Sequence, residues 1–175
     1  MDTFDYIIVG GGSAGCVVAN RLSADPDVSV CLIEAGGNGK SPWVSIPAGI
    51  FGLYGNKKYD YSFVTVPQKH LCNRVMDVNR GKALGGSSAI NSMVYMRGNR
   101  NDYDGWAALG CEGWSYDEVL PVFKNMEANQ IGQSAEYRGF EGELSVSEQQ
   151  DANSVGKVFV AAGQVAGLPE NTDFN

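Results

Sequence analysis

Three glycines near the start of the chain have the spacing of a phosphate-binding loop. Gly10, Gly12 and Gly15 form the pattern GxGxxG between an apolar run, residues 4–9, and a segment of helical periodicity, residues 13–22. In such a loop glycine allows a tight turn, a close approach of the backbone to pyrophosphate and close helix–strand packing, while the helix N-terminus directs N–H groups at the anion. We therefore expect this loop to bind a dinucleotide.

An acidic residue stands where such a loop needs one. Glu34 follows the apolar run at residues 29–33 and lies 19 residues after Gly15. A carboxylate at the end of the second strand can accept hydrogen bonds from ribose hydroxyls, and its charge disfavours a 2′-phosphate. NADP is therefore the least favoured dinucleotide, whereas FAD and NAD both remain open.

A second glycine-rich stretch lies at residues 81–98, GKALGGSSAINSMVYMRG. The double glycine at 85–86 allows close approach of a ligand, and Ser87 or Ser88 is a good N-cap for a helix that we predict to continue to Gly98. On its own, a glycine turn with a serine cap is more often plain architecture than a binding site.

The elements that would position these loops form a strand–helix–strand unit of about thirty residues, the usual size of a right-handed βαβ crossover with a parallel pair of strands. Residues 39–55 are rich in turn residues and aromatics, so we expect an irregular segment there. Alternation at residues 61–66 and 74–78 predicts an antiparallel ribbon. Further on, we predict a helix over 114–126, where Pro121 would introduce a kink or begin a second helix, a strand over 141–146 and a helix over 154–166.

Composition narrows the class of protein. The 175 residues are 43% hydrophobic and 19% charged, with a formal net charge of −7, which suits a globular chain and disfavours nucleic acid and anionic lipid as partners. No apolar run is long enough for a signal peptide or a membrane span, so a cytoplasmic protein is expected. The four cysteines form no CxxC pair, and no metal site is predicted. The single histidine, His70, is predicted to lie in an exposed polar loop.

Longer motifs resemble a known family. The string GKALGGSSAINSMVYMRGNRNDYD at residues 81–104 is similar to the first signature of the glucose-methanol-choline (GMC) flavoprotein oxidoreductases. DYIIVGGGSAGCVVANRLS, EAGG and DYDGWAALGCEGWSYDEVLPVFKNME also resemble that family, particularly its choline-dehydrogenase-like branch. The resemblance implies an α/β fold, α+β overall, made of the N-terminal part of a Rossmann-like FAD-binding domain over residues 1–130, with an incomplete parallel sheet, and the start of a substrate-binding portion over 131–175.

The resemblance also implies FAD rather than NAD as the cofactor. The first glycine loop would bind the pyrophosphate, Glu34 the adenosine ribose, and the second loop with the residues after it the pyrophosphate and flavin end. The residues assigned to FAD in this way are Gly10, Gly12, Ser13, Ala14, Gly15, Glu34, Ala35, Lys82, Ala83, Leu84, Gly85, Gly86, Ser87, Ser88, Asn91, Ser92, Met93 and Val94. Some relatives attach FAD through a histidine after the double glycine, where this chain has Ala89, Ile90 and Asn91, so noncovalent FAD is expected.

Family members pass a hydride from the carbinol carbon of an alcohol to the flavin while a histidine takes the hydroxyl proton. That histidine comes late in family chains, so no catalytic residue is expected within these 175 residues, which we interpret as a fragment that would express poorly or aggregate alone. The alternatives are a non-catalytic dinucleotide-binding module and an NAD-dependent dehydrogenase. The sequence leaves open the alcohol, the electron acceptor, the choice between dehydrogenase and oxidase, and the oligomeric state.

Overall fold

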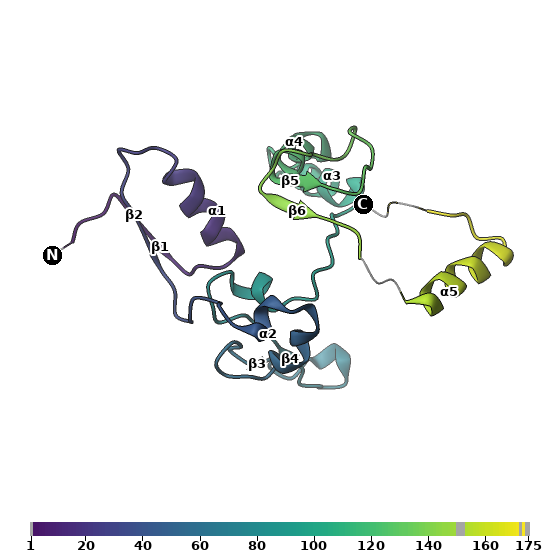
Figure 1. Ribbon diagram of the computed structural model, residues 1–175, viewed down its shortest axis with the longest axis horizontal. Helices are drawn as coiled ribbons and strands as arrows, with labels where there is room; N and C mark the ends of the chain where they lie inside the picture. Colours follow the sequence, from purple (N-terminus) through teal and green to yellow (C-terminus); the bar gives the residue numbers. More distant parts are fainter. Residues whose placement is uncertain (1, 150–152, 172, 174–175) are drawn as a thin grey trace. The chain divides into compact units, whose positions relative to one another are not determined.

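A computed structural model of the protein describes residues 2–149, 153–171 and 173 (Figure 1). The chain divides into two compact units, Met1–Val94 and Tyr95–Asn175. Within the described residues, no helix is long and apolar enough to cross a membrane. The predicted functional division at residue 130 does not coincide with the boundary between the compact units, and that division stays a prediction.

The first unit begins with the predicted strand–helix–strand element. Strand β1 (Tyr6–Val9) and strand β2 (Val30–Ile33) pair in parallel, from Tyr6 opposite Val30 to Val9 opposite Ile33, and helix α1 (Ser13–Leu22) connects them. This confirms the βαβ prediction. The sheet has only these two strands in the described chain, and large apolar side chains remain exposed on it, among them Ile7 and Val9.

The segment predicted to be irregular contains two short helical turns. Helix α2 (Pro42–Ser45) and the 3₁₀ turn η1 (Pro47–Gly52) both begin at a proline, whose fixed φ suits the first helical position. A small core of Leu53, Tyr59 and Ile90, with Val44 packed against it, lies beside them.

The predicted ribbon is present but shorter. Strand β3 (Phe63–Val64) pairs antiparallel with β4 (Asp77–Val78), and the 3₁₀ turn η2 (Lys69–Leu71) reverses the chain between them. His70 lies exposed in this turn, as expected. A further 3₁₀ turn, η3 (Gly86–Ala89), follows the ribbon.

The second unit contains three helices and one pair of strands among its described residues. Helices α3 (Arg100–Ala108) and α4 (Tyr116–Met126) are followed by β5 (Glu127–Asn129) and β6 (Leu144–Val146), which pair in parallel, and then by α5 (Ser154–Val165). Helix α4 confirms the predicted helix and runs through Pro121 as a single helix, so of the two alternatives at Pro121 the start of a second helix is excluded.

Aromatic side chains join α3 to α4. The buried Tyr103 ring contacts Trp106 and Phe123 edge to face, with ring centroids 5.4 and 5.6 Å apart. The Tyr116 backbone N–H also donates to an Asp104 carboxylate oxygen at 2.9 Å. These contacts stabilise the packing of the two helices, because an aromatic pair contributes about 1 kcal/mol beyond the free energy gained by burying its apolar area.

Candidate functional site

The first glycine loop turns directly from β1 into α1. Gly10 has φ of +98°, which only glycine adopts without strain. A Cβ built on Gly15 would lie 1.9 Å from the carbonyl oxygen of Gly10, so α1 can pack this close to the turn only with glycine at position 15. These are the tasks that the sequence pattern assigned to the two glycines.

The N-terminus of α1 faces the loop without a side-chain cap. Gly12 occupies the N-cap position and offers no side-chain acceptor. Within the described part of the chain, no hydrogen bond engages the backbone N–H of Ser13, Ala14 or Gly15. First-turn N–H groups of this kind, together with the helix dipole, bind anions. The predicted site residues Ser13 and Ala14 would therefore bind an anion through their backbone N–H groups and not through their side chains.

Glu34 bridges the loop and the segment after β2. One carboxylate oxygen accepts the Gly11 N–H at 2.7 Å, and the other accepts the Gly36 N–H at 2.8 Å. A carboxylate has about four acceptor positions, so two remain available for a pair of hydroxyl donors. The half-buried Glu34 is thus fixed in place and still able to accept a diol, with Ala35 next to it in the chain.

The second glycine loop packs directly onto the first. The Gly85 N–H donates to the Gly11 carbonyl at 2.7 Å, and the Leu84 N–H donates to the Gly37 carbonyl at 2.8 Å. A Cβ built on Gly86 would lie 2.7 Å from the Cα of Gly12, so the two backbones touch at two glycines. Ala83 is fully buried in this contact region. The structure therefore brings together two loops that are about seventy residues apart in sequence.

The conformation predicted for the second loop was wrong. A helix from the serines to Gly98 is absent: only the one-turn η3 forms, the backbone leaves the helical region at Ile90, and Met93 has a left-handed φ of +60°. Gly85 is the N-cap. The Ser87 hydroxyl accepts the Gly81 N–H at 3.2 Å, and the Ser88 hydroxyl donates to the Gly85 carbonyl at 2.6 Å.

The predicted site residues after this loop lie in non-helical backbone. Met93 has φ of +60°, and its N–H donates to the Asn91 side-chain oxygen at 3.0 Å. Met93 and Val94 have exposed side chains. Asn91, Ser92, Met93 and Val94 therefore follow the second loop as an irregular segment, and their assignment to a cofactor stays a prediction.

Sequence reasoning missed a buried carboxylate that secures the second loop. Asp60 is 1% exposed and accepts hydrogen bonds from the backbone N–H groups of Gly55, Ser62 and Arg80 at 2.8–2.9 Å, as well as from the Asn79 amide. Burial raises the pKa of Asp60, but these hydrogen bonds outweigh it and lower the pKa to about 2. The carboxylate is therefore ionised at neutral pH and fixes the backbone at residue 80, directly before the second glycine-rich stretch.

Tyr59, the residue before Asp60, also connects the second loop to the rest of the first unit. The Lys82 N–H donates to the Tyr59 carbonyl at 2.7 Å, and the Tyr59 hydroxyl donates to the Ser41 hydroxyl at 3.0 Å. The start of the loop is thus tied to the small core that contains Tyr59. An aspartate after a lysine pair in a polar stretch resembles a solvated turn, so the sequence carried no signal for its burial.

The second unit contains a buried group of charges around Arg97 and Glu127. The Arg97 guanidinium binds the Glu127 carboxylate, and the side chains of these two residues are 4% and 0% exposed. Arg138, also buried, lies 3.9 Å from the other Glu127 oxygen and binds Asp173. The Asn129 amide donates to the same carboxylate at 2.9 Å. These groups hold β5 and the loop before β6 together.

The charged residues that follow Arg97 begin a helix that we had not predicted. The Asn99 side-chain oxygen accepts the Asn101 N–H at 2.9 Å, and the Asp102 carboxylate accepts the Asn99 N–H at 2.8 Å. This is a capping box, and its spacing was available in the sequence as a helix-start signal.

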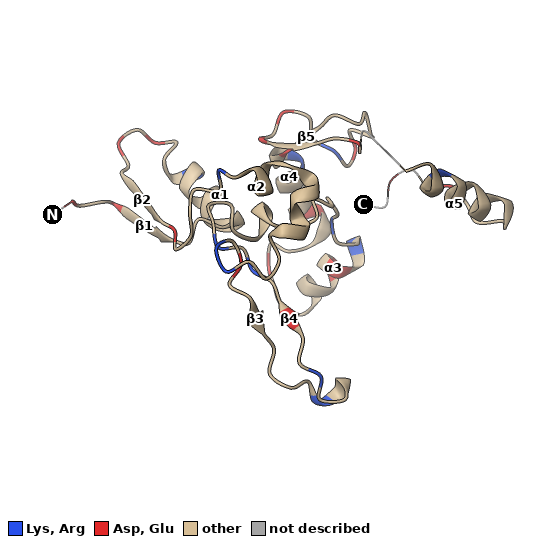
Figure 2. Ribbon diagram, turned by 60° about the horizontal axis from the view of Figure 1, so that its bottom comes forward, with Lys and Arg blue, Asp and Glu red and all other residues tan. Residues whose placement is uncertain are grey.

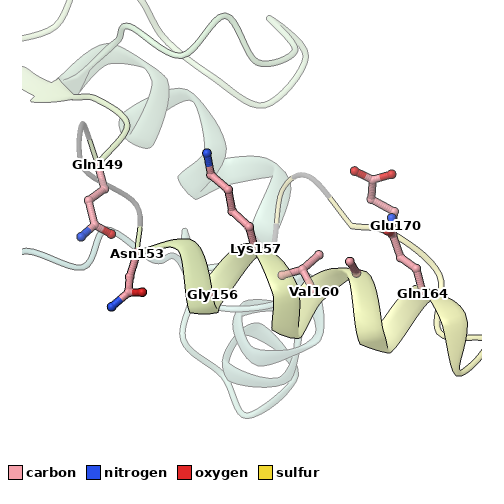
Figure 3. A pocket seen from close by; sticks show the side chains of 8 residues that line it. Gln149, Asn153, Gly156, Lys157, Val160, Gln164 and Glu170 are labelled. Carbon is pink, nitrogen blue, oxygen red and sulfur yellow. The ribbon is translucent and has the colours of Figure 1, made fainter.

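A shallow depression on the second unit lies along α5 and involves none of the predicted site residues (Figure 3). One helix and its flanks supply all of its lining, which comprises Gln149, Asn153, Gly156, Lys157, Val160, Ala161, Gln164 and Glu170. Among the described residues, no polar groups from separate elements converge there, so it is not a candidate for the cofactor site.

Residues 4–175 match the family model of the GMC oxidoreductases. The chain belongs to this family. It is 49% identical over 172 residues to an alcohol dehydrogenase (acceptor) of Pseudomonas putida and 44% identical over 175 residues to an oxygen-dependent choline dehydrogenase of Photobacterium profundum, and it covers 31% of each. These matches take in 98% and 99% of the chain, which therefore spans about a third of the length of the curated relatives it matches.

A solved structure supports the same assignment. The FAD-dependent oxidoreductase from Chaetomium thermophilum superimposes with a TM-score of 0.82 at 32% identity, over 98% of this chain and 31% of that one. The Rossmann-like fold expected from the sequence is therefore confirmed for this GMC oxidoreductase chain.

Proposed function

We propose that this chain is the FAD-binding N-terminal portion of an oxidoreductase that acts on the CH–OH group of an alcohol. The observation that carries the proposal is the direct contact of the two glycine loops beside Glu34. A single glycine loop would serve NAD equally well, whereas two backbone surfaces meeting at Gly12 and Gly86 suit a longer dinucleotide that contacts both. The names of the relatives, an alcohol and a choline dehydrogenase, supply the substrate class.

The residues present fit FAD in three respects. The N–H groups of Ser13, Ala14 and Gly15 suit a pyrophosphate, and space remains beside Gly10, where a built Cβ meets no atom within 4 Å. Glu34 retains acceptor positions for ribose hydroxyls. When bound, FAD supplies the hydride acceptor.

The chain's own contribution is binding and orientation. The first loop and Glu34 would hold the adenosine side, and the residues from Lys82 to Ser88, with those from Asn91 to Val94, would line the pyrophosphate and flavin side. We further propose that binding is noncovalent, because Ala89, Ile90 and Asn91 offer no nucleophile of the histidine type where some relatives attach FAD. The base that removes the hydroxyl proton would come from the part of the protein that corresponds to the rest of the relatives' length.

The full-length protein tests this function directly. Purified protein should show a flavin absorption spectrum, release free FAD on denaturation and reduce the flavin when an alcohol is added. Gly15→Ala should abolish flavin binding, because its Cβ would lie 1.9 Å from a carbonyl oxygen. Gly105→Ala, in α3, meets no atom within 4 Å and should keep the flavin. A colourless protein that reduces NAD with an alcohol would contradict the proposal.

A further inference from the structure

One asparagine of the first unit is followed directly by glycine. Asn38 and Gly39 lie in the segment that connects β2 to α2, and the sequence contains no other Asn–Gly pair (Figure 2). Because glycine has no side chain, its backbone nitrogen is open to the side chain of the preceding asparagine. In such a pair an asparagine reacts most readily with its own backbone.

The Asn38 side chain is held over the peptide bond to Gly39. Its Oδ1 accepts the Lys40 N–H at 3.1 Å, which closes an Asx turn. A hydrogen bond to this oxygen polarises the side-chain carbonyl group and stabilises the negative charge that develops on the oxygen when a nucleophile attacks the carbon. The side chain of Asn38 is thus both positioned and activated for attack at Cγ.

The backbone nitrogen of Gly39 is the nucleophile closest in the chain to this carbon. Among the described residues, no hydrogen bond engages the Gly39 N–H. Gly39 has φ of +71°, and a Cβ built on it would lie 3.1 Å from the Leu84 carbonyl oxygen, so a larger residue at this position would be strained. The glycine that makes the pair reactive is therefore also the residue that the local backbone requires.

We propose that Asn38 is a site of spontaneous deamidation through a cyclic imide formed with Gly39. The Gly39 nitrogen gives up its proton and forms a bond to Asn38 Cγ, while the bond from Cγ to Nδ2 breaks and the nitrogen leaves with that proton as ammonia. Water then opens the ring at one of its two carbonyl groups, which gives aspartate or isoaspartate. Both products carry a new negative charge, and isoaspartate also places an additional carbon atom in the main chain.

Isoaspartate at position 38 would disturb the contacts beside the second glycine loop. The Gly37 carbonyl accepts the Leu84 N–H at 2.8 Å, and the Gly36 N–H donates to Glu34 at 2.8 Å. An additional main-chain carbon next to these residues changes the spacing on which both hydrogen bonds depend. We therefore expect the aged protein to release its cofactor more readily. The deamidation depends only on local atoms, whereas its effect on the cofactor rests on the proposed function.

Ageing of the full-length, flavin-loaded protein tests the proposal, and Asn56 is an internal control. Asn56 is exposed like Asn38, and its Oδ1 accepts the Lys58 N–H at the same distance of 3.1 Å, but Lys57 follows it in place of glycine. After incubation in warm, mildly alkaline buffer, peptide mapping by mass spectrometry should detect aspartate and isoaspartate at position 38 while Asn56 remains intact. The flavin content of the protein should fall as isoaspartate accumulates.

Two variants separate the modification from its effect. Asn38→Asp carries the new charge but keeps the normal main chain and an oxygen that can accept the Lys40 N–H, so it should retain flavin. Asn38→Gln closes the ring less readily and should keep its flavin through the same ageing.

The deamidation is overturned if Asn38 stays intact or reacts no faster than Asn56, whatever the flavin content. Its effect on the cofactor is overturned if the aged wild type keeps its flavin, or if aged Asn38→Gln loses flavin equally fast. A protein that holds no flavin before ageing would contradict the proposed function, and the mass spectra would still decide the fate of Asn38.

Discussion

Replacing Asp60 with asparagine should destabilise the protein and loosen the second glycine loop. Asparagine preserves the shape of the side chain, but its NH₂ group would face N–H donors where a carboxylate oxygen now accepts two hydrogen bonds. The pKa of Asp60 is about 2 in the folded protein. In an unfolded chain the pKa of aspartate is about 3.9, and this difference corresponds to about 2.5 kcal/mol of stability at neutral pH.

The dependence on pH follows from the sign of that difference. Because the folded pKa is the lower one, the ionised carboxylate stabilises the folded state fully above about pH 5, and this stabilisation is lost as the pH falls toward 2. Unfolding of the full-length protein in urea, followed by tryptophan fluorescence, should show Asp60→Asn to be about 2 kcal/mol less stable at pH 7. The difference in unfolding free energy between wild type and variant should become smaller as the solution is acidified.

Asp77→Asn is the matched control, because it removes one exposed carboxylate from β4 in the same compact unit. Its cost should stay below about 0.5 kcal/mol. The Asp60 variant should also release flavin more readily, whereas the Asp77 variant should not. A stability gap that is constant from pH 7 to acid, or an equal loss in both variants, would refute the reasoning.

Three further predictions follow from the same contacts. Glu34→Gln should weaken FAD binding at least tenfold, as measured by fluorescence titration, because an amide can accept only one of the two backbone N–H groups that the carboxylate now accepts. Glu127→Ala should cost about 3–5 kcal/mol of unfolding free energy, since it removes the buried carboxylate that Arg97 binds, whereas Asp117→Asn breaks an exposed ion pair and should cost less than about 1 kcal/mol. Residues 1–175 expressed alone should aggregate in light scattering, because Val9 is 83% exposed on an uncovered parallel sheet, and a monomer with a cooperative melting transition would contradict this.

The strand–helix–strand unit could be predicted because its signals are local. Glycines at a fixed spacing, a β-branched run and a helical periodicity all lie within about thirty residues, and each agrees with the others. The α4 start was predictable for the same reason, since Ser115 and Glu118 stand three residues apart and the Glu118 carboxylate accepts the Ser115 N–H at 3.1 Å. Local consistency of this kind leaves tertiary contacts little to override.

The second loop shows where local reasoning fails. Ile90 occupies a position of apparent helical periodicity, but it is buried with Leu53 and Tyr59 while its own backbone is not helical. An apolar residue is satisfied by burial in any backbone conformation, so periodicity over one turn is weak evidence. Asp60 was missed for a related reason. Its donors come from positions 2 to 20 residues away, and no pattern in the sequence indicates that they converge.

The contact between the loops changes what the glycine patterns mean. Each pattern alone describes a backbone that can approach a ligand, but Gly12 and Gly86 are needed because the two backbones approach each other. A chain of hydrogen bonds then runs from the Gly85 N–H to the Gly11 carbonyl and from the Gly11 N–H to Glu34. A ligand that orders the first loop and Glu34 should therefore also order the second loop, so under the proposed assignment binding of the adenosine end would favour the geometry required at the flavin end. By this linkage, loss of FAD should increase amide exchange in both loops together, even where only one of them touches the part of the ligand that was lost.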